Sequence, residues 1–150
     1  TLSVSGELEA KEIGRDGRFI AYDNGTVLDT KTNLMWARAD GEAPDVFHSD
    51  AKKYCQDYRV GGYSDWRLPT LDELRTLYNQ NYTNEDGYHI TKLINLEADN
   101  TWANHNSLGG PAAFNYKSGS LVVDGYNSHW GWSTRLSSGI HVLPVRDATN

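Results

Sequence analysis

The chain has 150 residues, the size of one domain, and a domain of this length buries about two-thirds of the surface of its unfolded chain. Its formal net charge of −6 argues against nucleic acid or an anionic membrane surface as a partner. No apolar run approaches the ~20 residues of a membrane span, and the single cysteine excludes an internal disulfide, a Cys-x-x-Cys redox pair and a multi-cysteine zinc site.

The chain begins without an initiator methionine and without a signal-peptide pattern. We therefore expect Thr1 to be a cut site, either a mature N-terminus or the start of a domain excised from a longer protein. Residues 1–17 are polar and are predicted to form a tail or a short edge strand. Residues 18–147 are predicted to form one domain, and residues 148–150 a second tail.

The first part of this domain is predicted to be β structure. Residues 18–22 favour a strand that ends at the Asp-Asn-Gly turn of residues 23–25. Residues 26–29 and 34–36 then favour a hairpin. Asn33 stands in its turn, and asparagine is one of the few residues other than glycine that tolerate the left-handed backbone conformation.

Two helices are expected to follow. Ser49 is a candidate N-cap of the first, which has apolar residues at helical spacing. Cys55 lies on that apolar side, so we predict a small core residue with an unreactive thiol. The apolar positions of this helix are Ala51, Tyr54, Cys55 and Tyr58.

The second helix is signalled within residues 61–75, GGYSDWRLPTLDELR. A glycine turn precedes Trp66, which is large enough to anchor a core. Pro69 forbids helix at the residue before it, and Thr70 with Glu73 predicts a capping box. The buried side of this helix is predicted to consist of Leu71, Leu74 and Tyr78.

Two stretches in this middle part admit both a structural and a functional interpretation. For Asp65 and Arg67 we favour a buried or half-buried structural ion pair over a ligand-binding one. The oxygen-rich residues 84–87 resemble calcium ligands in type. Their spacing matches no EF-hand loop, so we expect them to be solvated. Residues 90–96 favour one short helical turn.

The composition changes at Thr101, after which only five charged residues occur. Turns at residues 117–120 and 136–139 predict two further hairpins, and so a small twisted antiparallel sheet with both helices on one face. The order of helices and strands indicates the α+β class. The strands are predicted at residues 101–102, 113–116, 121–123, 130–134 and 140–145.

Several of these segments together resemble the Lcl C-terminal domain family, which is named after a collagen-like bacterial adhesin and was long described as a domain of unknown function. The resemblance covers residues 18–147. The most specific segment is the Asp-Trp-Arg-Leu-Pro-Thr of residues 65–70. It is supported by residues 25–29, 34–36, 51–55, 131–133 and 142–146 and by Trp102.

This resemblance implies a C-type-lectin-like fold with long loops, in a bacterial exported or surface-attached protein, and it implies no reaction. In such folds the ligand site lies on loops between late strands. Side chains there suit a neutral, hydroxyl-rich ligand, because amides and imidazoles hydrogen-bond and aromatic rings stack on sugars. The candidate ligand-binding residues are Asn104, His105, Asn106, Tyr126, Asn127, His129 and Trp130.

A core role for Trp130 is an equal alternative, and Trp132 is predicted to fill the core. The Glu-Pro-Asn and Gln-Pro-Asp triplets of calcium-dependent sugar lectins do not occur, and Asn104 is not followed by the carboxylate of a Trp-Asn-Asp motif. We therefore predict no metal and no other cofactor, and the negative net charge disfavours a polyanionic glycan.

Three functions remain open. The first is a non-catalytic, adhesin-like domain that binds a glycan or a protein. The second is a structural or assembly module that caps a longer surface protein and self-associates through it. The third is an enzyme related to the formylglycine-generating type, but that chemistry needs two cysteines to hold copper, and only Cys55 is present. We predict no enzyme activity, and an extracellular or cell-surface location, with the periplasm as an alternative.

Overall fold

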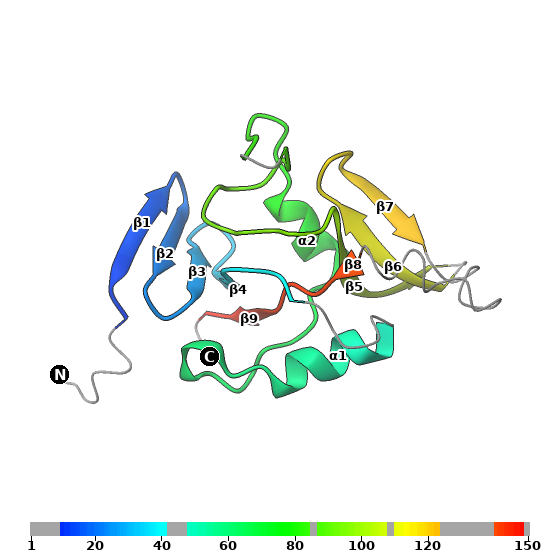
Figure 1. Ribbon diagram of the computed structural model, residues 1–150, viewed down its shortest axis with the longest axis horizontal. Helices are drawn as coiled ribbons and strands as arrows, with labels where there is room; N and C mark the ends of the chain where they lie inside the picture. Colours follow the sequence, from blue (N-terminus) through cyan, green and yellow to red (C-terminus); the bar gives the residue numbers. More distant parts are fainter. Residues whose placement is uncertain (1–9, 42–47, 85–86, 108–109, 124–139, 149–150) are drawn as a thin grey trace.

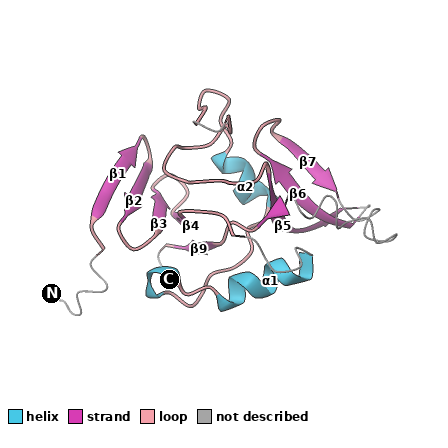
Figure 2. Cartoon of the chain, in the orientation of Figure 1, coloured by secondary structure: helices cyan, strands magenta, loops and turns pink. Residues whose placement is uncertain are grey.

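The computed structural model describes residues 10–41, 48–84, 87–107, 110–123 and 140–148. These residues form an α+β structure with two small β-sheets and two α-helices (Figures 1 and 2). The predicted strand at 130–134 and the turn at 136–139 lie outside the described residues. None of the helices that the described ranges contain is long and apolar enough to cross a membrane.

The first sheet has five antiparallel strands in the order β1-β2-β3-β4-β9. β1 lies at its edge, as predicted for part of residues 1–17. The predicted hairpin is confirmed: Thr26 pairs with Ala37 and Asp29 with Leu34, and Asn33 adopts a left-handed φ of 61°. The strands are β1 (Glu12–Asp16), β2 (Phe19–Tyr22), β3 (Thr26–Asp29), β4 (Leu34–Ala37) and β9 (Val145–Asp147).

The second sheet has four strands in the order β7-β6-β5-β8, and its β5–β8 pair is parallel. The turn predicted at residues 117–120 is confirmed, because β6 and β7 pair antiparallel across it. The strands are β5 (Asn100–Ser107), β6 (Gly110–Asn115), β7 (Ser120–Val123) and β8 (Ile140–His141). Figure 1 shows the two sheets side by side, with α2 (Leu71–Leu77) between them and α1 (His48–Asp57) along the lower edge.

The prediction that both helices cover one face of the late sheet is wrong, because they cover opposite faces. Three successive residues of β5 (Thr101, Trp102 and Ala103) are all buried, and successive side chains of a strand point to opposite faces. The α1 side is a small cluster of Ala51, Cys55, Leu68, Trp102, Ala113 and Val142. The α2 side includes Leu71, Leu74, Leu77, Ala103, Phe114 and Tyr116.

The single strand predicted for residues 140–145 is also wrong. It is two short strands, and they belong to different sheets. The chain leaves β8 after His141, and Pro144 precedes β9. A proline has no N–H for a ladder, and here its carbonyl accepts a hydrogen bond from Ala37 at 3.0 Å. Residues 90–96 form turns rather than a helical turn.

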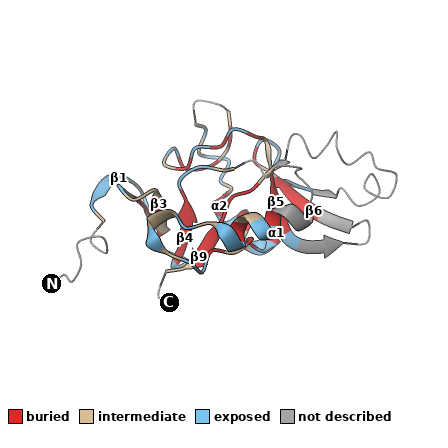
Figure 3. Ribbon diagram, turned by 60° about the horizontal axis from the view of Figure 1, so that its bottom comes forward, coloured by how far each residue is buried: buried red, intermediate tan, exposed pale blue. Residues whose placement is uncertain are grey.

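The core lies between the two sheets. Figure 3 shows buried residues along β4, β9, β5 and β6, whereas α1 keeps an exposed outer side. Trp66 is buried in this core as predicted, and its indole N–H donates to the Val60 carbonyl at 3.1 Å. Cys55 is fully buried, so its predicted place in the core is confirmed, and burial raises the pKa of its thiol to about 12.

Candidate functional site

The segment of residues 65–70 ties the two sheets together. Arg67 and Val145 exchange two backbone hydrogen bonds of 2.8 and 3.0 Å, which join the segment to the first sheet. The Pro69 carbonyl accepts a hydrogen bond of 2.6 Å from the N–H of Asn104, which joins it to the second. The segment with the most specific sequence pattern therefore fixes how the sheets meet.

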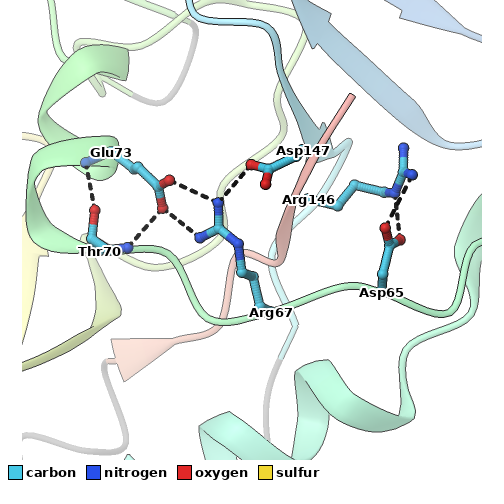
Figure 4. Close-up of polar contacts among 6 residues, drawn as sticks. All are labelled: Asp65, Arg67, Thr70, Glu73, Arg146 and Asp147. Carbon is cyan, nitrogen blue, oxygen red and sulfur yellow. Dashed lines mark hydrogen bonds and ion pairs between the residues drawn. The ribbon is translucent and has the colours of Figure 1, made fainter. Parts of the chain in front are cut away.

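An ion cluster around Arg67 strengthens this junction (Figure 4). Its guanidinium donates to both carboxylate oxygens of Glu73 at 2.7 and 2.8 Å and to Asp147 at 3.0 Å. Glu73 also accepts from the N–H of Thr70, and Thr70 accepts from the N–H of Glu73, so the predicted capping box is confirmed. Burial raises the pKa of Glu73, but hydrogen bonds from Arg67 and Thr70 outweigh it and lower the pKa overall.

A second ion pair joins the same segment to β9. Arg146 has an exposed fraction of only 2% and donates to the two oxygens of Asp65 at 2.6 and 3.2 Å (Figure 4). The Tyr63 ring covers the guanidinium, with 3.8 Å between the Arg146 Cζ and the ring centroid. The hydrogen bond from Arg146 lowers the pKa of Asp65.

The predicted structural pairing of Asp65 with Arg67 is thus corrected. Both side chains form ion pairs that hold the fold together, but not with each other. Asp65 pairs with Arg146 of β9, whereas Arg67 pairs with Glu73 of α2 and with Asp147 of β9 (Figure 4). The sequence contained the charges but no signal for their partners.

Asn104, the first of the predicted site residues, lies at a bulge in β5. Trp102 pairs with Ala113 and Asn106 with Pro111, so three residues of β5 face a single residue of β6. Such a bulge disrupts the ladder and redirects side chains. Ala103 is fully buried, whereas Asn104 is exposed, and its N–H is held by the Pro69 carbonyl instead of by β6.

The structure brings the first three predicted residues together and leaves the others untested. Asn104, His105 and Asn106 belong to one stretch of β5 at the bulge, although only the side chain of Asn104 is described. The remaining four candidates lie outside the described residues. They are Tyr126, Asn127, His129 and Trp130.

Sequence reasoning missed a buried pair of Asp40 and His141. The Asp40 carboxylate accepts hydrogen bonds from the N–H groups of Glu97 and Ala98 and lies 3.1 Å from the His141 Nδ1. Burial raises the pKa of Asp40, while these hydrogen bonds and His141 oppose the rise. The pair joins three segments up to 101 residues apart, so no local pattern could have found it.

The described side chains show no other reactive arrangement. Within the described ranges, no three His, Cys, Asp or Glu side chains gather as metal ligands would. The buried thiol of Cys55 is protonated at neutral pH, since burial raises its pKa to about 12. At the bulge, a backbone held by the hydrogen bond to Pro69 presents a neutral amide at the surface.

Comparison with known proteins adds one finding. The family model described as the Lcl C-terminal domain matches residues 25–146. The comparison with curated proteins gave no match, and neither did the comparison with solved structures.

Proposed function

The chain belongs to the Lcl C-terminal domain family, and from this membership and the site geometry we propose that it is a non-catalytic ligand-binding domain of a bacterial exported or surface protein. Its fold under this proposal is C-type-lectin-like. Three features support that: a closing strand, β9, that returns beside β4; two helices; and a second, late sheet of β5, β6, β7 and β8.

One observation carries the proposal, namely the bulge at Asn104. β5 leaves its pairing with β6 there. The N–H of Asn104 instead donates to the Pro69 carbonyl at 2.6 Å, and Pro69 belongs to the segment of residues 65–70 that joins the two sheets. The amide side chain is exposed on a backbone that two ion clusters keep in place. A rigid backbone with an exposed hydrogen-bonding group lowers the entropic cost of binding.

The proposed ligand is a neutral glycan. An amide supplies both donors and an acceptor, which is what sugar hydroxyls require. Fixed charges are scarce in the strands around the bulge: β5, β6 and β7 contain none. The aromatic candidates Tyr126 and Trp130 remain a prediction from sequence, as stacking partners for the same ligand.

A glycan array tests the proposal directly. The purified domain would be screened in buffer with calcium and again with a chelator. We expect binding to neutral glycans that survives chelation, because hydrogen bonding and stacking need no metal. Loss of binding with the chelator would contradict the metal-free site, and a blank array in both buffers would favour a protein partner or an assembly role.

Two single substitutions locate the site. Asn104→Ala removes the exposed amide of the bulge and is expected to weaken glycan binding at least about threefold, the effect of one lost hydrogen bond. Asn95→Ala is the matched control, since Asn95 is exposed and makes its β-bridge to Ala39 through the backbone. Equal binding by both variants would place the site elsewhere.

A further inference from the structure

The outer face of the five-stranded sheet contains a cavity that the proposed glycan site does not use. Its volume is about 310 Å³, near the lower end of the roughly 300–1,000 Å³ typical of small-molecule pockets. The cavity lies over β2, β3 and β4, on the face turned away from Trp36 and the core. Its lining consists of Ala10, Tyr22, Asn24, Thr26, Leu28, Asn33, Met35, Tyr63 and Ala148.

The register explains why this face is hollow. Leu28 pairs with Met35, and Met35 pairs with Arg146, so these three side chains form one row across the outer face. Within the part of the chain that the structure describes, no α-helix covers that row. The loop around Tyr63 reaches it, because the Tyr63 ring rests on Arg146 and packs edge-on against Trp66 at 6.3 Å between ring centroids.

The cavity offers several hydrogen-bonding groups that the described residues leave unused. The hydroxyls of Tyr22 and Tyr63 and the amide of Asn33 have no hydrogen-bond partner among the described residues. Asn24 uses its side-chain oxygen to accept from Thr26 at 2.7 Å, which leaves its amide N–H groups for a ligand. These groups surround an apolar floor of Leu28 and Met35.

None of the described residues that line the cavity is charged. The Arg146 guanidinium, on the strand beside Met35, is 2% exposed, is covered by Tyr63 and is bound by both oxygens of Asp65. Among the described lining residues, a carboxylate, phosphate or sulfate would therefore find no counter-charge, and a cation would find no carboxylate. The lining selects an uncharged ligand.

We propose that this cavity binds one neutral sugar ring, such as the terminal residue of an uncharged glycan. A sugar ring combines hydroxyls for the Tyr22, Asn24, Asn33 and Tyr63 groups with an apolar C–H face for the tyrosine rings and the floor. The inference does not depend on the site at Asn104, which lies on the other sheet.

The test is a titration of the ¹⁵N-labelled chain with methyl glycosides of glucose, galactose and mannose and with N-acetylglucosamine, followed by amide chemical shifts. We expect at least one sugar to shift the amides of Asn24, Asn33 and Tyr63, with saturation. Tyr22→Phe removes one hydroxyl, and Asn33→Gly removes one amide while keeping the left-handed turn. Each is expected to weaken binding about two- to tenfold.

A matched control and a blocking variant sharpen the result. Asn95→Gly removes an exposed amide outside the cavity and is expected to leave the affinity unchanged. Leu28→Trp fills the cavity and is expected to abolish binding, while an unchanged spectrum elsewhere verifies its fold. The proposal is overturned if no sugar shifts these amides, if shifts occur only around Asn104, or if only sulfated sugars added in parallel produce them.

Discussion

The two sheets of this domain differ in how their faces are covered. The four-stranded sheet is packed on both faces, by α1 and by α2, so consecutive residues of β5 and β6 are buried. The five-stranded sheet has the core on one face, and on its other face Ile20, Met35 and Arg146 are buried while Tyr22 and Leu28 stay half-buried around a cavity. In this sheet Asn104 is exposed where the pairing of β5 with β6 fails, at the bulge.

This difference separates the parts of the molecule that stabilise it from those available to a ligand. The interior of the second sheet and the ion clusters at residues 65–70 hold the fold. The bulge and the outer cavity contribute little to it. Substitutions should therefore fall into two groups, and the following five predictions run from the largest expected effect on stability to the smallest.

Trp102→Ala should be the most damaging, because it empties a site between α1 and β5 where the side chain is 1% exposed. We expect a loss of about 3–5 kcal/mol in the free energy of unfolding, measured by urea denaturation. Tyr22→Ala, on the half-covered outer face, should cost only about 1 kcal/mol. Similar losses for both would mean that the two faces are equally packed.

Arg67→Met should have the next largest effect. It keeps an apolar stem but leaves Glu73 and Asp147 without their shared cation at the junction of the sheets. We expect a loss of about 1–2 kcal/mol. The control is Arg75→Met, which breaks an exposed pair with Asp72 and should change stability by less than about 0.5 kcal/mol. If both substitutions lowered the free energy of unfolding by the same amount, the ion cluster around Arg67 would not be what stabilises the junction of the sheets.

Asn33→Ala should cost about 1 kcal/mol, because alanine strains at the φ of 61° that Asn33 adopts. Asn33→Gly meets no such strain and should leave the melting temperature nearly unchanged. The pair of variants distinguishes backbone strain from side-chain contacts. A loss of stability with glycine as large as with alanine would show that the Asn33 side chain supports the sheet.

The pH dependence of stability should reveal the contribution of Glu73 to the free energy of unfolding. The pKa of Glu73 in the folded protein lies below the ordinary value of 4.5. Its stabilising contribution is therefore complete above about pH 4.5 and is lost as the pH falls through the lowered pKa. Urea denaturation between about pH 7 and pH 3 should show the advantage of wild type over Glu73→Gln shrinking as the pH falls. A constant difference across this range would contradict the assigned shift.

Asn104→Ala should have the smallest effect, under about 0.5 kcal/mol, because the side chain is exposed and the bulge is held by the backbone bond to Pro69. Thermal unfolding would measure it. A clear drop in melting temperature would mean that the amide is part of the structure, and a loss of glycan binding by this variant could then not be assigned to the site.

A larger part of the fold than of the site could be predicted from the sequence. The hairpin around Asn33, the capping box of Thr70 and Glu73, and the buried Cys55 all follow from residues within a few positions of one another. Of the candidate site, the sequence indicated Asn104 by its residue type. It carried no sign of the bulge, which depends on how β6 pairs with β5.

By itself, then, the sequence determined the hairpin around Asn33, the capping box, the α+β class and the family, because capping and turns act over short distances. Only the tertiary structure decided the partners of Asp65 and Arg67, the placing of the helices on opposite faces, the Asp40–His141 pair and the outer cavity. Apart from the Arg67–Glu73 pair, whose residues are six positions apart, these contacts join residues tens of positions apart. The reason is physical: long-range partners are selected by packing and burial of the whole chain, which no short pattern encodes.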